Sequence, residues 1–337
     1  MTNSATVSLV DPQDLVGVRT TSDDFFQIGR EEARKFAQAA SEASPLCWNA
    51  AEARAAGHPA PLVPLTFAAL MGGPMAQNGL LPPQYSLSQV LHVEQRNVYH
   101  RPMYVGARIW RVSGLESFRP SDRADQLVIK TDFVDESGEV LQEVWVTLLA
   151  RAGAADPAVA AAAEKVMLVV PSVDPGRTAG PEPSAVHLPL EDLPPGPAVA
   201  DAATLAAGQI LDQRTYQISR GNLVAYSGVA GDPNPIHFSD EMARRAGLET
   251  VVAQAMLTMA MGGSYLTRLV GDPSAVREYR ARFSNPIYVQ PDAPAEVTFG
   301  GKVKTFDAGR KRAELALTAV HNGRRVFGKA IAVVDLR

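Results

Sequence analysis

An internal repeat constrains the fold of this 337-residue chain more than any other feature of its sequence. The segment PIHFSDEMARRAG (235–247) aligns without a gap with PLCWNAAEARAAG (45–57), proline to proline and glycine to glycine. An apolar, helix-like stretch follows each glycine at the same distance, and strand-like segments follow each stretch. Self-similarity on this scale indicates repeated structural units. We therefore predict two copies of one α+β fold.

The two copies are separated by a stretch rich in proline, alanine and glycine. Such a composition cannot bury a regular element over its whole length, so this stretch is predicted to be a linker that drapes over a domain surface. We expect a first domain at residues 1–153, the linker at 154–208 and a second domain at 209–337.

The second copy carries the clearer pattern of elements. A strand is predicted in ILDQRTYQIS, and four more in the segments 275–288, 294–306, 310–322 and 324–336. The dipeptide Asn322-Gly323 is a strong hairpin signal. AQAMLTMAMGGSYLT is apolar on nearly every side and predicts a buried helix. One buried helix wrapped by an antiparallel sheet is an α+β layout.

Composition narrows the classes of protein. The single cysteine, Cys47, cannot form an internal disulfide, and the N-terminal segment lacks the layout of a secretory signal, so we expect a cytoplasmic protein. No apolar run reaches the roughly 20 residues of a membrane-spanning helix. From Gln209 onward basic residues outnumber acidic ones, but without the pattern of a nucleic-acid motif. This charge suits an acidic carrier protein or a phosphorylated cofactor arm.

The stretch GDPNPIHF (231–238) places three reactive side chains, Asp232, Asn234 and His237, around two prolines. Prolines stiffen a turn, so the carboxylate and the imidazole can converge on one small volume with little freedom left to lose. Histidine can transfer protons near neutral pH, with a carboxylate as its partner. The alternative is structural: Asp232 and Asn234 are also good turn-capping residues.

Comparison with the first copy indicates that these three side chains have a role beyond forming the turn. Pro45 matches Pro235, yet the matching polar positions hold Glu42, Ser44 and Cys47. Only the second copy therefore has the complete set, and Cys47 is expected to be an inert core residue.

The segment YSGVAGDPNPIHFSDEMARRAG resembles the signature of the MaoC-like, (R)-specific hydratase and dehydratase family, whose motif is D-x-N-P-x-H. The resemblance covers nearly the whole chain. The second half resembles the catalytic subunit, and the first half the non-catalytic subunit, of the mycobacterial-type (3R)-hydroxyacyl-carrier-protein dehydratase. It implies a double hot dog, in which two hot-dog domains pair as a pseudo-dimer with their sheets side by side and one site between the halves.

The resemblance also implies roles for single residues. His237 would transfer the proton at C2 of the substrate and Asp232 would handle the hydroxyl, although the reverse division fits equally well. Asn234 would support the pair. The backbone N–H of Ala255 would bind the thioester oxygen, at a pair where the family commonly reads His-Gly and this chain reads Gln254-Ala255.

The glycines that follow on the same helix, Gly262 and Gly263, would let an acyl chain or the sheet pack closely, so a substrate channel is predicted there, with a plain packing role as the equal alternative. We expect no metal and no bound cofactor.

The predicted function is reversible dehydration of (3R)-hydroxyacyl thioesters to trans-2-enoyl thioesters. The predicted substrates are medium to long acyl chains carried by an acyl carrier protein in fatty-acid elongation. One alternative is an (R)-specific enoyl-CoA hydratase, and another is a non-catalytic acyl-binding protein. The partner is thus an acyl-carrier-protein or CoA thioester, and the double hot dog can pair again as a homodimer.

Overall fold

The computed structural model describes residues 11–72, 82, 84–85, 90–150, 157–166 and 205–336. The first half comprises η1 (Pro12–Leu15), β1 (Arg19–Thr21), β2 (Phe26–Gln27), α1 (Arg30–Ala39), α2 (Pro45–Trp48), α3 (Ala50–Ala55), α4 (Ala68–Gly72), β3 (Leu91–Tyr99), β4 (Arg108–Arg119), β5 (Asp125–Val134) and β6 (Val140–Ala150). After α5 (Pro157–Val166), the second half comprises β7 (Ile210–Ile218), α6 (Arg220–Ala230), η4 (Pro235–His237), α7 (Asp240–Arg245), α8 (Ala255–Val270), η5 (Pro273–Ala275), β8 (Val276–Phe283), β9 (Ala295–Asp307), β10 (Arg312–His321), β11 (Arg324–Arg325) and β12 (Phe327–Asp335).

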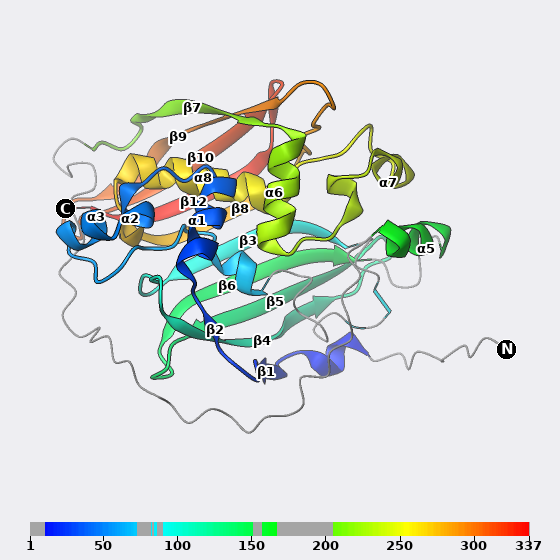
Figure 1. The fold of residues 1–337 in the computed structure, drawn as a ribbon, viewed down its shortest axis with the longest axis horizontal. Helices are drawn as coiled ribbons and strands as arrows, with labels where there is room; N and C mark the ends of the chain where they lie inside the picture. The colour runs from blue at the N-terminus through cyan, green and yellow to red at the C-terminus, as the bar shows by residue number, and fades with distance from the viewer. Residues whose placement is uncertain are drawn as a thin grey trace.

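One antiparallel sheet runs through both halves (Figure 1). Its strand order is β1-β4-β5-β6-β3-β8-β12-β10-β9-β7, so the four long strands of the first half appear in reverse order in the second half. The helices repeat as well, with α1 matching α6 and α3 matching α7. The predicted duplication of an α+β fold is therefore confirmed, and the five strands predicted in the second half are all present. The turn at Asn322-Gly323 has positive φ at both residues, as its hairpin requires.

The two halves meet at the β3–β8 ladder. Glu94 pairs with Arg282 at one end of this ladder and Val98 with Glu278 at the other. Two crossed ion pairs reinforce it: Arg96 donates two hydrogen bonds of 2.9 Å to Glu278, and Arg280 donates one of 2.6 Å to Glu94. These pairs connect one half to the other, so the sheets of the halves are joined edge to edge.

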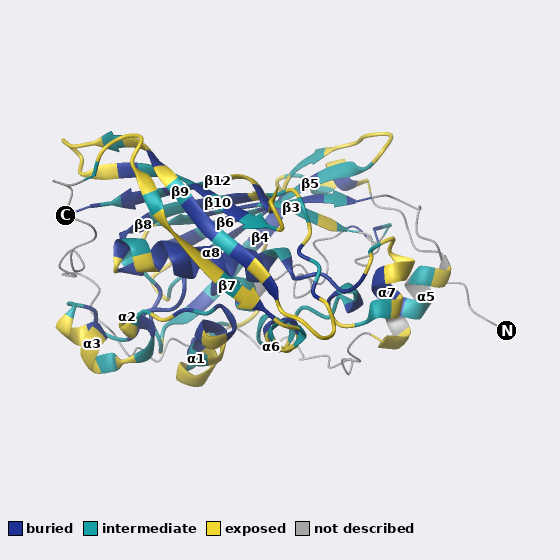
Figure 2. Cartoon of the chain, turned by 90° about the horizontal axis from the view of Figure 1, so that it is seen from above, coloured by how far each residue is buried: buried dark blue, intermediate teal, exposed yellow. Residues whose placement is uncertain are grey.

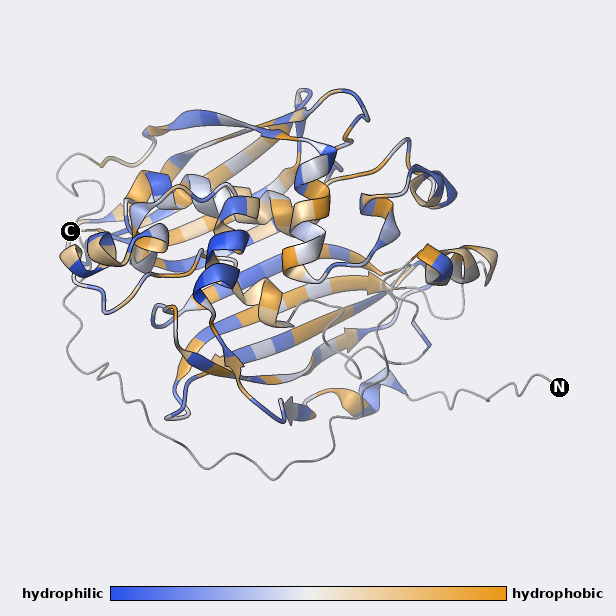
Figure 3. Ribbon diagram, viewed as in Figure 1, coloured by the Kyte–Doolittle hydropathy of each residue, from blue (hydrophilic) through white to orange (hydrophobic). Residues whose placement is uncertain are grey.

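The helices lie on one face of this sheet, as the view in Figure 2 shows. The strands alternate accordingly. In β5, Leu127, Ile129, Thr131 and Phe133 are buried while the residues between them are half-buried. The same alternation appears as orange and blue bands along the strands in Figure 3. An antiparallel sheet covered on one face has this pattern.

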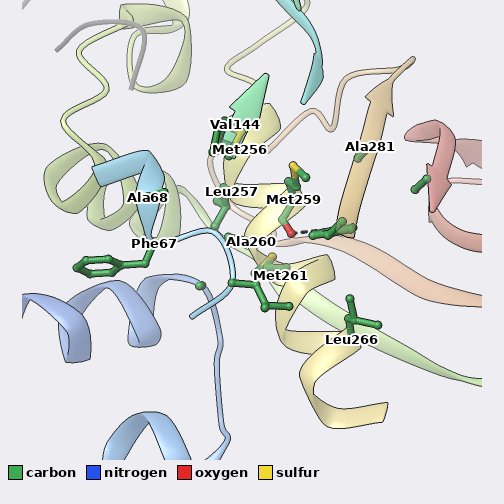
Figure 4. Close-up of a cluster of buried hydrophobic side chains, with 14 of the residues drawn as sticks. Phe67, Ala68, Val144, Met256, Leu257, Met259, Ala260, Met261, Leu266 and Ala281 are labelled. Carbon is green, nitrogen blue, oxygen red and sulfur yellow. Dashed lines mark hydrogen bonds between the residues drawn. The ribbon is translucent and has the colours of Figure 1, made fainter. Parts of the chain in front are cut away.

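Helix α8 occupies the centre of the second half and is buried on nearly every side. The strands β8 to β12 curve around it, and residues of the first half cover the remainder. Figure 4 shows its buried side chains together with Phe67 and Ala68 of the first half and Ala281 of β8. The hydroxyl of Ser264 donates a hydrogen bond of 2.9 Å to the carbonyl of Ala40, which ties α8 to the end of α1.

Gly262 and Gly263 lie where α8 touches its neighbours. A Cβ on Gly262 would overlap the hydroxyl of Tyr279 in β8, whereas a Cβ on Gly263 would meet the Cβ of Leu65 at an ordinary 3.5 Å. Gly262 is therefore needed for close contact between the helix and the sheet, and not for an acyl chain.

The linker differs from the prediction in one respect. Residues 157–166 form helix α5, which contacts α7 of the second half. Alanine is the best helix former, and the segment PAVAAAAEKV is rich in it. The remainder of the predicted linker, apart from residues 205–208, lies outside the described residues, so the boundaries at 153/154 and 208/209 stay predictions. In the first half α4 covers only Ala68–Gly72, and residues 73–81 of the predicted helix also lie outside the described part.

The two glycines of α8 provide a matched pair of substitutions. Gly262→Ala should lower the free energy of unfolding by about 1–3 kcal/mol, because its methyl group overpacks against Tyr279. Gly263→Ala should leave it unchanged or raise it by up to about 1 kcal/mol, because alanine favours the helix and the space exists. Denaturant unfolding measures both values, and equal stability of the two variants would contradict the packing role of Gly262.

Candidate active site

The turn after α6 is built by hydrogen bonds of its own residues. The helix ends at Gly231, whose φ of 63° is left-handed and suits glycine. The backbone N–H of Asp232 then returns to the carbonyl of Ser227 at 3.1 Å. One carboxylate oxygen of Asp232, Oδ1, accepts the N–H of Asn234 at 3.1 Å. These bonds fix the direction of the Asp232 side chain.

Asn234 begins the short helix η4, and its side chain accepts the N–H of Ile236 at 3.3 Å. Pro235 occupies the first position of this helix, where its missing N–H costs nothing. His237 closes it, and its Nδ1 donates a hydrogen bond of 2.8 Å to the carbonyl of Val252. Since Nδ1 carries the proton, the neutral imidazole presents the lone pair of Nε2.

The two predicted catalytic groups face one another. Nε2 of His237 lies 3.6 Å from Oδ2 of Asp232, a separation longer than a hydrogen bond. Burial lowers the pKa of His237, and the charge of Asp232 and the Val252 carbonyl oppose that shift only in part. The imidazole is therefore neutral at neutral pH and its Nε2 can accept a proton.

The N-terminus of α8 lies against the same site. Ala255 is its first residue, and the first N–H groups of a helix have no carbonyl partner within it. The side chain of Gln254 holds this end against α6, because its Nε2 donates to the carbonyl of Leu223 at 3.0 Å and to the hydroxyl of Ser227 at 2.9 Å. In this chain Gln254 is thus a structural link between α6 and α8.

A cavity of about 530 Å³ joins these groups, and residues of both halves line it. Its wall is mainly apolar. The second half contributes Tyr226, Asp232, Asn234, His237, Ala255 and Met256 among others, and the first half contributes Ala68, Val93, Gln95, Phe133, Val146 and Leu148 among others. The cavity thus extends from the His237 imidazole across the sheet of the first half.

The structure therefore brings together Asp232, Asn234, His237 and Ala255. Asp232 and Asn234 also cap the turn through their side chains. The turn-capping role named as the alternative is therefore present as well. Oδ2 of Asp232 remains for the cavity. Neither Gly262 nor Gly263 lines this cavity, so the substrate channel predicted at these glycines is not part of it.

The cavity wall also contains a tyrosine that the sequence did not single out. Tyr226 is 1% exposed, and its hydroxyl has no hydrogen-bond partner among the described residues. Its signal in the sequence is weak, since a tyrosine in an apolar helix usually indicates core packing.

The corresponding place in the first half is closed. Glu42 is 4% exposed, its Oε1 accepts the N–H of Ser44 at 2.8 Å, and its Oε2 has no partner within the described chain. Burial raises the pKa of Glu42 to about 7. Cys47 is buried, and burial raises the pKa of its thiol well above the ordinary value, as expected for an inert core cysteine. The cavity lining does not include Glu42, Ser44 or Cys47.

The described residues contain no cluster of three or more histidine, cysteine or acidic side chains that could hold a metal ion. No helix among them has the length and apolarity needed to cross a membrane.

Comparison with known proteins finds a separate family model for each half of the chain. The family model described as "FAS1-like, dehydratase domain region" matches residues 14–144, and the one described as "MaoC like domain" matches residues 202–320. A UPF0336 protein from Parafrankia sp. is 39% identical over 149 residues, which are 43% of this chain and 97% of that protein.

Solved structures cover nearly the whole chain. One described as a MaoC-like dehydratase aligns with a TM-score of 0.84 at 29% identity, over 97% of this chain and 100% of that one. A Mycobacterium tuberculosis protein described as a double hotdog fold aligns with a TM-score of 0.63 at 13% identity, over 96% and 97% of the two chains, and shows the fold alone.

The fold is thus a double hot dog, and residues of both halves line the cavity that holds Asp232, Asn234 and His237. The chain belongs to the MaoC-like dehydratase family, with a FAS1-like dehydratase region in its first half and a MaoC-like domain in its second. Its fold and its class, that of the hydratases and dehydratases, are those expected from the sequence.

The buried carboxyl of Glu42 predicts a pH-dependent stability. Its pKa is raised from 4.5 to about 7 in the folded protein, so its stabilising contribution is complete below pH 4.5 and is lost as the pH rises through 7. Glu42→Gln mimics the protonated form and should be more stable than the parent at pH 8, by about 3 kcal/mol.

Denaturant unfolding at pH 4.5 and pH 8 measures this difference, which should vanish at the lower pH. Glu116→Gln changes an exposed carboxyl on β4 and should show no such dependence. A loss of stability in Glu42→Gln at pH 8 would contradict the interpretation.

Proposed function

We propose that this protein is a (3R)-hydroxyacyl-thioester dehydratase that converts its substrates reversibly to trans-2-enoyl thioesters. One observation carries the proposal: a neutral imidazole and a carboxylate, 3.6 Å apart, face one apolar cavity beside the N-terminus of a buried helix. Dehydration requires removal of a proton from C2, departure of the hydroxyl from C3 and stabilisation of charge on the thioester oxygen. Each requirement has a matching group.

His237 is the base at C2. Its Nε2 lone pair is free because Nδ1 donates to the carbonyl of Val252, and its lowered pKa keeps it unprotonated. As the C2–H bond breaks, the proton passes to Nε2 and the carbon electrons form the C2–C3 double bond.

Asp232 holds the 3-hydroxyl through Oδ2, since Oδ1 is occupied by the turn. The C3–O bond breaks with its electron pair on oxygen. This oxygen takes the proton that Nε2 of His237 received from C2 and leaves as water, so the imidazole is neutral again and Asp232 remains a carboxylate throughout. In hydration the same groups act in reverse order.

The N–H of Ala255 supports the enolate-like charge on the thioester oxygen. It combines a free donor with the partial positive charge of the helix N-terminus. The Gln254 side chain fixes this end of α8 against α6, which carries the turn of Asp232. The Ala255 N–H and the pair of Asp232 and His237 are therefore held in a fixed arrangement relative to one another.

The cavity wall supports an acyl substrate of medium to long chain. Its volume of about 530 Å³ lies within the range of ligand sites, and its apolar part extends over the first half. The basic excess of the second half favours an acyl carrier protein over a neutral partner. Competition between carrier-protein and CoA thioesters distinguishes this substrate from that of an (R)-specific enoyl-CoA hydratase.

The first test follows the absorbance of trans-2-enoyl thioesters of increasing chain length during hydration by the purified protein. Asp232→Asn and His237→Ala should each lower kcat/KM by roughly 10²- to 10⁴-fold, because Asp232 holds the hydroxyl and His237 transfers the proton. Asp292→Asn and His321→Ala change the same residue types outside the cavity and should retain the parent rate. Parent-like rates in the first pair would contradict the catalytic assignment.

A second test isolates the helix amide. Ala255→Pro removes the N–H at the first helical position, where proline is tolerated, and Gln254 already has the extended ψ of 135° that suits a residue before proline. We expect a folded protein whose kcat is lower by roughly 10²- to 10³-fold.

Ala255→Gly is the matched control, because it keeps the N–H and should keep the turnover. Circular dichroism and thermal unfolding confirm the fold of both variants. If Ala255→Pro were folded and fully active, the amide would have no role in the reaction.

A further inference from the structure

Tyr226 is a buried side chain whose hydroxyl the fold leaves without a partner. It lies on α6, is 1% exposed and lines the cavity beside Asp232 and His237. No group in the described part of the chain accepts or donates a hydrogen bond to its Oη. Buried polar groups nearly always have partners, so an orphan hydroxyl on a residue of the cavity wall indicates a place for a ligand group.

The first half of the chain holds this ring in place. Phe36 of α1 packs against it with ring centroids 6.0 Å apart, and α1 and α6 lie side by side (Figure 1). Phenylalanine would fill the same space without the cost of an unpaired hydroxyl. The hydroxyl therefore contributes nothing to the packing.

The chemistry of the hydroxyl is that of a donor. Burial raises the pKa of Tyr226, and the charge of Asp232 adds to the shift, so the group stays protonated. Asp232 lies at the end of the same helix and turn, and its carboxylate can only accept hydrogen bonds. A substrate hydroxyl that donates to Asp232 still has lone pairs to satisfy, and it gathers negative charge as the C3–O bond breaks.

We propose that the Tyr226 hydroxyl donates a hydrogen bond to the 3-oxygen of the acyl substrate, opposite the carboxylate of Asp232. This inference rests on the proposed function and adds a second group that recognises the same oxygen. The thioester carbonyl is already served by the N–H of Ala255. Tyr226 and Asp232 together would therefore select substrates that carry an oxygen at C3.

The kinetic test compares Tyr226→Phe with Tyr279→Phe. Tyr226→Phe should lower kcat/KM for (3R)-hydroxyacyl thioesters roughly ten- to hundredfold, while its Tm is unchanged or higher because no protein hydrogen bond is lost. Tyr279 lies outside the cavity, and its hydroxyl donates to the carbonyl of Met259 at 3.1 Å. Tyr279→Phe should lower the Tm and leave the kinetics unchanged.

A binding test identifies the oxygen that Tyr226 contacts. In an inactive His237→Ala background, calorimetry gives the Kd of a (3R)-hydroxyacyl-CoA and of the saturated acyl-CoA of equal length. Adding Tyr226→Phe should weaken the first roughly tenfold and leave the second unchanged. A dehydrated contaminant is excluded by chromatography of the recovered ligand.

Three results would overturn the inference: an unchanged kcat/KM in Tyr226→Phe, a lowered Tm, or an equal loss of affinity for both ligands. The last would place the hydroxyl on the thioester carbonyl or the acyl chain. A parent protein inert toward every thioester would overturn the proposed function and this inference together. Activity in the parent with no effect of Tyr226→Phe would overturn the inference alone.

Discussion

The backbone pairing of β3 with β8 is the interaction on which the rest of the structure depends. It joins two half-sheets into one and is reinforced by the crossed pairs of Arg96 with Glu278 and Arg280 with Glu94. Because the join is edge to edge, the helices of both halves lie on one face and α1 packs against α6. The cavity arises between the halves for the same reason, with Asp232 and His237 from one half and much of the apolar wall from the other.

The duplication gives this chain two equivalent places, and among the described residues the one in the second half faces a cavity. In the second half, Asp232 and His237 face a cavity. In the first half, the corresponding Glu42 and Cys47 are buried in the core. A carboxyl buried without a full set of partners costs free energy when it ionises, which is the reason for the raised pKa of Glu42. The first half thus contributes part of the cavity wall, while its own Glu42 and Cys47 are buried in the core.

The open site retains polar groups that the fold does not satisfy. The Tyr226 hydroxyl and the Gln254 Oε1 are buried without partners in the described chain, and Nε2 of His237 lies beyond hydrogen-bond distance of Asp232. Such groups reduce the stability of the empty protein, which is a usual cost of a site arranged for a ligand. The proline-containing turn and the hydrogen bonds of Gln254 keep these groups in position even without a ligand.

The sequence by itself determined the duplication, the strands of the second half, the buried central helix and the Asp232-His237 turn, because these depend on local periodicity and on turn chemistry that proline and glycine impose. It could not place Tyr226 in the cavity, because a tyrosine in an apolar helix predicts core packing as long as its neighbours are unknown. It also assigned Gly262 to a channel, although the Tyr279 hydroxyl fills that place. The roles of Tyr226 and Gly262 depend on contacts between side chains that are far apart in the sequence. The tertiary structure alone decided them, because the cavity forms where two halves approach, and neither half contains it in its own pattern.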